Sequence, residues 1–207
     1  MTHSLHRRGN LENLKDDYVV LVTPAVGINH KDSKEKLRKI IDKIFELGPN
    51  NIGSYETGTV FSGATIEQIK EQLSETPRVR CCFDDKEKVK KLIKFIKDND
   101  FGLSVTISGL IDDVKSMAKE ENLSPHSINL SLGIYGKTDE LPSEEVLEFV
   151  TMCGHGMISR YLVEKLIDDV KKGRKTPQKA AEIMAKPCVC GIFNVKRAKQ
   201  LLEKYAK

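Results

Sequence analysis

Two short segments in the C-terminal third of the chain carry residue types that bind metal ions or act as nucleophiles. MCGHG contains Cys153 and His155, and CVCG contains Cys188 and Cys190. In an extended turn, side chains at positions i and i+2 point the same way, so each pair can hold one ion. If the segments meet, they supply either a Cys3His set, typical of zinc, or three thiolates and a histidine beside an iron–sulfur cluster.

Three glycines flank these residues, at Gly154, Gly156 and Gly191. We expect them to help bind the cofactor, because glycine accepts positive φ and lets the backbone approach a bulky centre. A standard iron–sulfur cluster would take its fourth thiolate from Cys81 or Cys82. Neighbours on a strand face opposite sides of the sheet, so at most one of these two is expected at the site.

The same residues also suit a cofactor-free thiol enzyme. Cys153 would be the reactive thiol, and both His155 and a helix starting near Ser159 would lower its pKa. The motif MCGHG resembles the active-site loop of proline-racemase-like enzymes, in which a thiolate beside a Gly-His-Gly turn removes a proton next to a carboxylate. The resemblance covers five residues, and the chain is too short for that family's duplicated fold, so we take only the mechanism from it.

A noncatalytic interpretation is the third alternative. Free cysteine is among the most buried residue types, so the thiols can simply be part of the core. The protein would then bind a small ligand or regulate a partner without catalysing a reaction.

Composition limits the classes of function. The chain has 207 residues, 39% of them hydrophobic, which is enough for a real core. Its 34 Lys and Arg interleave with 30 Asp and Glu, so we expect no nucleic-acid partner but allow a small anionic metabolite as ligand. No feature specifies an oligomeric state.

Location and redox state follow from other features of the sequence. No apolar stretch reaches the roughly 20 residues that span a membrane, and MTHSLHRRGN has no apolar signal-peptide core. We therefore expect a cytoplasmic protein without a membrane partner. The odd number of cysteines, 5, favours ligands, nucleophiles or buried thiols over disulfides.

Strand and helix patterns alternate up to about residue 140. After a polar arm at 1–16, apolar strand patterns occur at 17–23, 78–83, 101–107 and 127–134. Amphipathic helix patterns occur at 32–48, 65–73, 84–96 and 110–121, with capping pairs Asp32 and Glu35, Thr65 and Gln68, and Asp84 and Glu87.

This alternation predicts an α/β or α+β fold with helices mainly on one face of a two-layer sheet. We prefer a ferredoxin-like arrangement to a doubly wound sheet. The sheet domain is expected to span 17–140, and 141–207 to form a helical, cysteine-rich segment. Its helices should start at Ser143, at Ser159, at Thr176 with Pro177, and at Asn194.

Overall fold

In the computed structural model, which describes residues 6–205, five strands form one antiparallel sheet in the order β3-β2-β4-β1-β5. The strands are β1 (Tyr18–Thr23), β2 (Asn51–Ser54), β3 (Gly58–Thr59), β4 (Val79–Phe83) and β5 (Ser104–Ser108). The helices are α1 (Leu11–Leu14), α2 (Ser33–Leu47), α3 (Ile66–Glu71), α4 (Lys86–Asp98), α5 (Ile111–Glu120), α6 (Glu144–Val150), α7 (Arg160–Lys171), α8 (Pro177–Ala185) and α9 (Val195–Tyr205). Short 3-10 helices span Val60–Ser62 and Thr138–Glu140.

The connections of the sheet are those of a ferredoxin-like fold. Strand β4 lies between β1 and β2 and is antiparallel to both, so β1, α2 and β2 form a split β-α-β unit. Strand β5 pairs with the other edge of β1, after the crossover through α4. The two-layer α/β prediction is confirmed, and the short β3 extends the sheet beyond β2.

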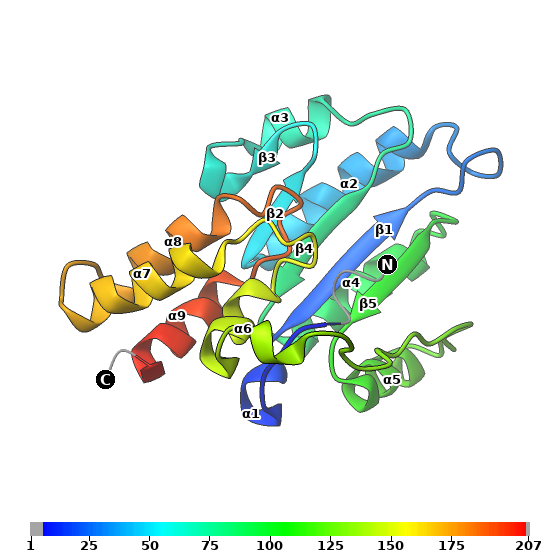
Figure 1. The fold of residues 1–207 in the computed structure, drawn as a ribbon. Coiled ribbons are helices and arrows are strands. Elements are labelled where there is room, and N and C mark those ends of the chain that lie inside the picture. Colours follow the sequence, from blue (N-terminus) through cyan, green and yellow to red (C-terminus); the bar gives the residue numbers. More distant parts are fainter. Residues whose placement is uncertain (1–5, 206–207) are drawn as a thin grey trace.

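Alternation along the strands gives the sheet two different faces. Val20 and Cys81 lie in one core cluster with the apolar residues of α2 and α4. Their neighbours Val19 and Cys82 face the other side and share a second cluster with α6 to α9. Figure 1 shows these C-terminal helices, coloured yellow to red, gathered beside β2 and β4. Helices α2 and α4 thus form the second layer of the sheet domain, and the C-terminal helical segment covers the other face of the sheet.

Polar caps start most of the predicted helices where expected. The Ser143 hydroxyl accepts a hydrogen bond from the Val146 amide, and Thr176 accepts one from Lys179. Asn194 Oδ1 likewise accepts from the Arg197 amide at 3.1 Å. Helix α7 begins directly after Ser159, although that side chain makes no capping bond. The reciprocal Thr65–Gln68 capping box is confirmed at α3.

Two capping predictions were wrong. Asp32 precedes α2 but has a left-handed backbone with φ 61° and makes no capping bond, so the expected box with Glu35 does not form. Helix α4 is capped by Asp85, which accepts from the Glu87 amide, and not by Asp84. The Asp84 carboxylate instead pairs with Lys196 of α9.

The strand predicted at 127–134 does not form. This segment is an irregular loop, in which Leu130 is 67% and Leu132 is 86% exposed. Alternation indicates how side chains would divide between two faces, but a strand also needs a neighbouring strand for its backbone hydrogen bonds. Within residues 6–205, the described sheet ends at β5 and gives the segment no such partner.

No helix among residues 6–205 combines the length and apolarity needed to cross a membrane.

Candidate metal or thiol site

The two predicted cysteine segments meet in the folded chain. Cys190 Sγ lies 3.8 Å from Nδ1 of His155, a residue 35 positions earlier, and 3.9 Å from Cys188 Sγ. The Cys188 thiol is also hydrogen-bonded with Cys153. Three sulfurs and one imidazole therefore form a continuous row, in the order Cys153, Cys188, Cys190, His155.

Each segment is a tight turn after a helix. The Cys153 amide donates to Val150 O at 3.2 Å, and the Cys188 amide donates to Ala185 O at 3.0 Å. These turns end α6 and α8 and place the thiols at the ends of the two helices. Both helices pack in the same core cluster, which explains why the turns lie together.

The glycines have different roles from one another. Gly191 has φ 72°, and a Cβ there would lie 2.1 Å from the amide nitrogen of Gly53, so the close approach is to β2 and not to a bound centre. Gly156 has φ 67° but open space around its Cα. Gly154 is exposed in the turn between the cysteine and the histidine.

Mutual hydrogen bonding moves the thiol pKa values apart. The bond from Cys188 lowers the pKa of Cys153 to about 6 against the opposing effect of burial, and the backbone amides of Met157 and His155 act in the same direction. The Cys188 bond also lowers the pKa of Cys190 to about 6. Cys188 itself has a raised pKa, since its hydrogen bonds with Cys153 and Cys190 favour its protonated form. One thiol proton donates to one thiolate at a time, so the row favours a thiolate at Cys153 or at Cys190 beside the proton that Cys188 keeps.

Strand alternation separates Cys81 from Cys82 as expected. Cys82 shares the core cluster of the three site cysteines and interacts electrostatically with Cys190, whereas Cys81 faces α2 and α4. Burial raises the pKa of both thiols. A fourth sulfur thus lies near the row, and it belongs to Cys82.

The N-terminal arm holds both cysteine turns. Arg7 Nη2 donates to the carbonyl oxygen of Met152 at 3.1 Å and also to that of Ile192. Its Nη1 pairs with the buried carboxylate of Asp17 at 2.5 Å, and Arg197 holds the other oxygen of that carboxylate at 2.8 Å. The described part of the polar arm at 1–16 therefore packs against both turns through Arg7.

Two further residues at the site were missed by sequence reasoning. The Tyr55 hydroxyl lies 2.6 Å from Nε2 of His155, and the Arg80 guanidinium carbon lies 4.5 Å from the centre of the Tyr55 ring. Arg80 precedes Cys82 by two positions, and the period of a strand places both on one face. That spacing was the available signal for Arg80, whereas Tyr55 depends on the turn after β2.

Burial differs sharply along the row. Cys153 is 2% exposed and Cys188 and Cys190 are 0% exposed, whereas His155 is exposed. Among residues 6–205, no three Cys, His, Asp or Glu side chains already stand in an arrangement that could hold a metal ion. The donors lie in a row, so binding one ion requires them to close around it.

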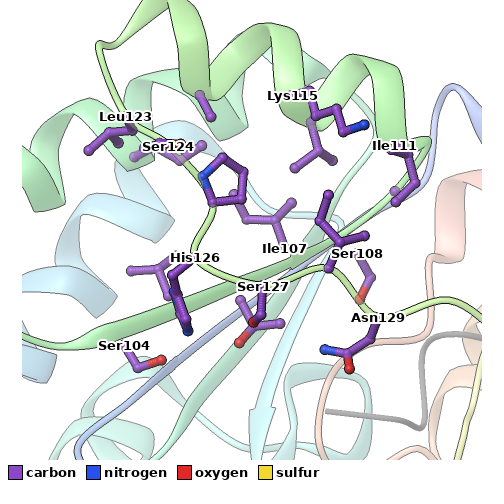
Figure 2. Close-up of a pocket in the computed structure, with 18 of the residues that line it drawn as sticks. Ser104, Ile107, Ser108, Ile111, Lys115, Leu123, Ser124, His126, Ser127 and Asn129 are labelled. Carbon is purple, nitrogen blue, oxygen red and sulfur yellow. The ribbon is translucent and has the colours of Figure 1, made fainter.

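A separate cavity of about 800 Å³ lies along β5, between α5 and the loop from Leu123 to Ser131. In the view of Figure 2, His126 of this loop lies toward Ser104 of the strand and Asn129 lies toward Ser108. His126 is exposed. The lining includes Arg7 but none of the three site cysteines, so this cavity is distinct from the thiol row.

No protein-family model, no curated protein and no solved structure is found to match this chain.

Proposed function

We propose that the protein is an enzyme that binds a metal centre, zinc or an iron–sulfur cluster, through Cys153, Cys188, Cys190 and His155, and acts on a small anionic metabolite. The observation that carries this proposal is the convergence of three buried sulfurs and one imidazole from two segments. Two sulfurs bound at about 2.3 Å to one tetrahedral zinc ion are about 3.8 Å apart. The separation of 3.9 Å between Cys188 and Cys190 fits that geometry.

Burial favours a metal over an exposed nucleophile. Thiolates are costly to bury without compensating charge, and a cation supplies that charge when it replaces the thiol protons. The lowered pKa values of Cys153 and Cys190, about 6, mean that few protons need to be displaced near neutral pH. His155 is exposed and can turn from Tyr55 toward the sulfurs as the fourth ligand.

A cofactor-free thiol enzyme is the second candidate. It is favoured by one observation, the pair of backbone amides, from His155 and Met157, that stabilise the Cys153 thiolate. In this case Cys153 would act as the nucleophile or proton carrier and His155 as its acid–base partner. The turn would have to open, because Cys153 is only 2% exposed.

We also place the protein in the cytoplasm and expect a small molecule as its ligand. All five cysteines are free thiols, as is usual in a reducing compartment. Basic and acidic residues are nearly balanced, with 34 against 30, which supports a small ligand over a nucleic acid.

Anaerobic purification followed by metal analysis and an absorption spectrum tests the proposal. We expect bound zinc, or iron with the broad visible absorption of a cluster, and its loss in Cys188→Ser. Cys81→Ser is the matched control, since Cys81 is equally buried but faces the other side of the sheet. A protein that binds neither zinc nor a reconstituted cluster contradicts the proposal, and rapid alkylation of Cys153 would then favour the thiol enzyme.

A further inference from the structure

Arg80 is a buried cation that has no carboxylate partner among residues 6–205. The residue is only 4% exposed, and its Nε has no hydrogen-bond partner. The Nε atoms of Arg7, Arg8 and Arg197 also have none, but within the described chain those residues donate through Nη atoms, as Arg80 does not. Among residues 6–205, it takes part in no ion pair within 4.0 Å, the limit for the pairs found elsewhere in the protein. Arginine is almost never fully buried unless it is paired, so this side chain is unusual.

The other buried arginines show what pairing looks like in this protein. Arg197, 0% exposed, donates to the Asp17 carboxylate at 2.8 Å and to Asn13 Oδ1 at 2.8 Å. Arg7 pairs with the same carboxylate. Arg80 has instead the face of Tyr55 at 4.5 Å. A cation–π contact is weaker than the cost of removing an unpaired charge from water, so this contact does not compensate the burial of Arg80.

The position of Arg80 connects it to the thiol row. It lies on the same face of β4 as Cys82, and the Tyr55 ring covers it. The Tyr55 hydroxyl is hydrogen-bonded with Nε2 of His155 at 2.6 Å. Tyr55 interacts electrostatically with Arg80 and Cys190, and also with the nearby Arg78. Opposite Arg80 on β2 is Gly53, where a Cβ would lie 2.6 Å from the carbonyl oxygen of Val189, so the turn that holds Cys188 and Cys190 packs directly on this strand. A group bound at Arg80 would therefore lie near that turn and near Tyr55.

We propose that Arg80 binds the anionic group of the substrate, a carboxylate or a phosphate, beside the thiol row. The planar guanidinium can donate two parallel N–H bonds to two oxygens of such a group, and Nε is one of the two donors in that fork. Tyr55 is 49% exposed and lies in the turn after β2. Its ring lies between Arg80 and the solvent, so an anion would reach Arg80 past the edge of this ring. This inference rests on the proposed function and adds the residue that selects the substrate class.

Thermal unfolding of the metal-free protein tests the inference. Inorganic phosphate and acetate are titrated separately, with chloride keeping the ionic strength constant. We expect at least one of them to raise Tm by roughly 3 °C or more at ten times its Kd, and the stronger anion identifies the substrate group as phosphate or carboxylate. Arg80→Met should abolish this rise, whereas Arg38→Met, on α2 and paired with Glu35, should keep it. In a chloride buffer without phosphate or acetate, the Tm of Arg80→Met should be no lower than that of the natural protein, whereas the Tm of Arg197→Met should be lower.

Absence of any anion-specific rise in the natural protein overturns the inference, as does a full rise in Arg80→Met. If Arg80→Met does not fold, the Nε–H resonance of Arg80 in the natural protein decides, with Arg80→Lys used to assign it. We expect phosphate or acetate to shift that resonance, and an unmoved resonance overturns the inference. The ability to bind metal is measured in a separate experiment. If the protein binds the anion but takes up neither zinc nor a cluster, only the proposed metal centre is contradicted.

Discussion

Nδ1 of His155 lies 3.8 Å from Sγ of Cys190, although the two residues are 35 positions apart in the chain. The contact exists because α6 and α8 end beside each other, and because Arg7 binds a carbonyl oxygen next to each turn. The site therefore depends on residues that carry none of its chemistry. Five predictions test this dependence and the chemistry itself.

Replacing Arg7 should loosen both cysteine turns. Arg7→Gln leaves the buried Asp17 with one arginine fewer, and breaking a buried ion pair costs about 3 kcal/mol at the lower end of the usual range. Arg8→Gln removes only the pair with the exposed Glu144, which is expected to cost less than about 1 kcal/mol. Urea unfolding measures both values, and labelling of Cys153 and Cys190 should accelerate only in Arg7→Gln. Equal effects of the two variants would contradict the role of Arg7.

Gly191 and Gly156 should respond differently to alanine. Both have positive φ, which costs a residue with a Cβ about 1 kcal/mol. In Gly191→Ala the new Cβ would also lie 2.1 Å from the Gly53 amide nitrogen, so the turn must move away from β2. We expect a loss well above 1 kcal/mol there and about 1 kcal/mol in Gly156→Ala, measured by urea unfolding. Equal losses would show that the contact with β2 is unimportant.

Cys81 and Cys82 should differ in their effect on the metal centre. Each is fully buried, so replacement by alanine is expected to lower the free energy of unfolding by about 1 kcal/mol in both cases. Only Cys82 faces the thiol row, so Cys82→Ala should lower the bound metal per chain more than Cys81→Ala does. Metal analysis of the two purified variants makes the comparison. Equal metal contents in the two variants would show that Cys82 only packs in the core and does not help bind the metal.

The stability of the metal-free protein should depend on pH through Cys153. Its pKa is about 6 in the folded protein because of the bond from Cys188, against about 8.5 in an unfolded chain. Between these values the unfolded state binds more protons, so stability should rise from about pH 6 to about pH 8.5 and be lost as pH falls through about 6. Cys153→Ala should reduce this rise and Cys81→Ala should keep it, as measured by urea midpoints across that range. An unchanged slope in Cys153→Ala would contradict the lowered pKa.

The loop from Ser127 to Ile134 should tolerate polar substitution. Leu132 is 86% exposed, so Leu132→Ser is expected to change the free energy of unfolding by no more than about 0.5 kcal/mol. Ile107→Ser in β5, which packs against a core cluster, is the control and should cost clearly more. Thermal unfolding measures both. A large loss in Leu132→Ser would indicate that the segment is paired, as a strand would be.

The sequence by itself predicted the helices α2 to α9 and the strands β1, β4 and β5. The stripe of Leu37, Ile40, Ile41 and Ile44 predicts α2, and the pairs at Thr65 and Gln68 and at Thr176 and Pro177 predict where helices begin, because these patterns act over one or two helical turns. The alternation of side chains along a strand predicted that Cys81 and Cys82 face opposite sides of the sheet, because this pattern is also local. The ferredoxin-like arrangement followed from the order of these elements.

Only the tertiary structure decided which residues form the site. The row of three thiols, its contact through His155 with Tyr55, and the unpaired Arg80 beneath that ring join segments from β2, β4 and the ends of α6 and α8. The strand expected at 127–134 failed for the same reason, since pairing depends on a partner elsewhere in the chain. Local patterns report on the surroundings of a few residues, whereas contacts between distant segments are set by how whole helices pack on the sheet.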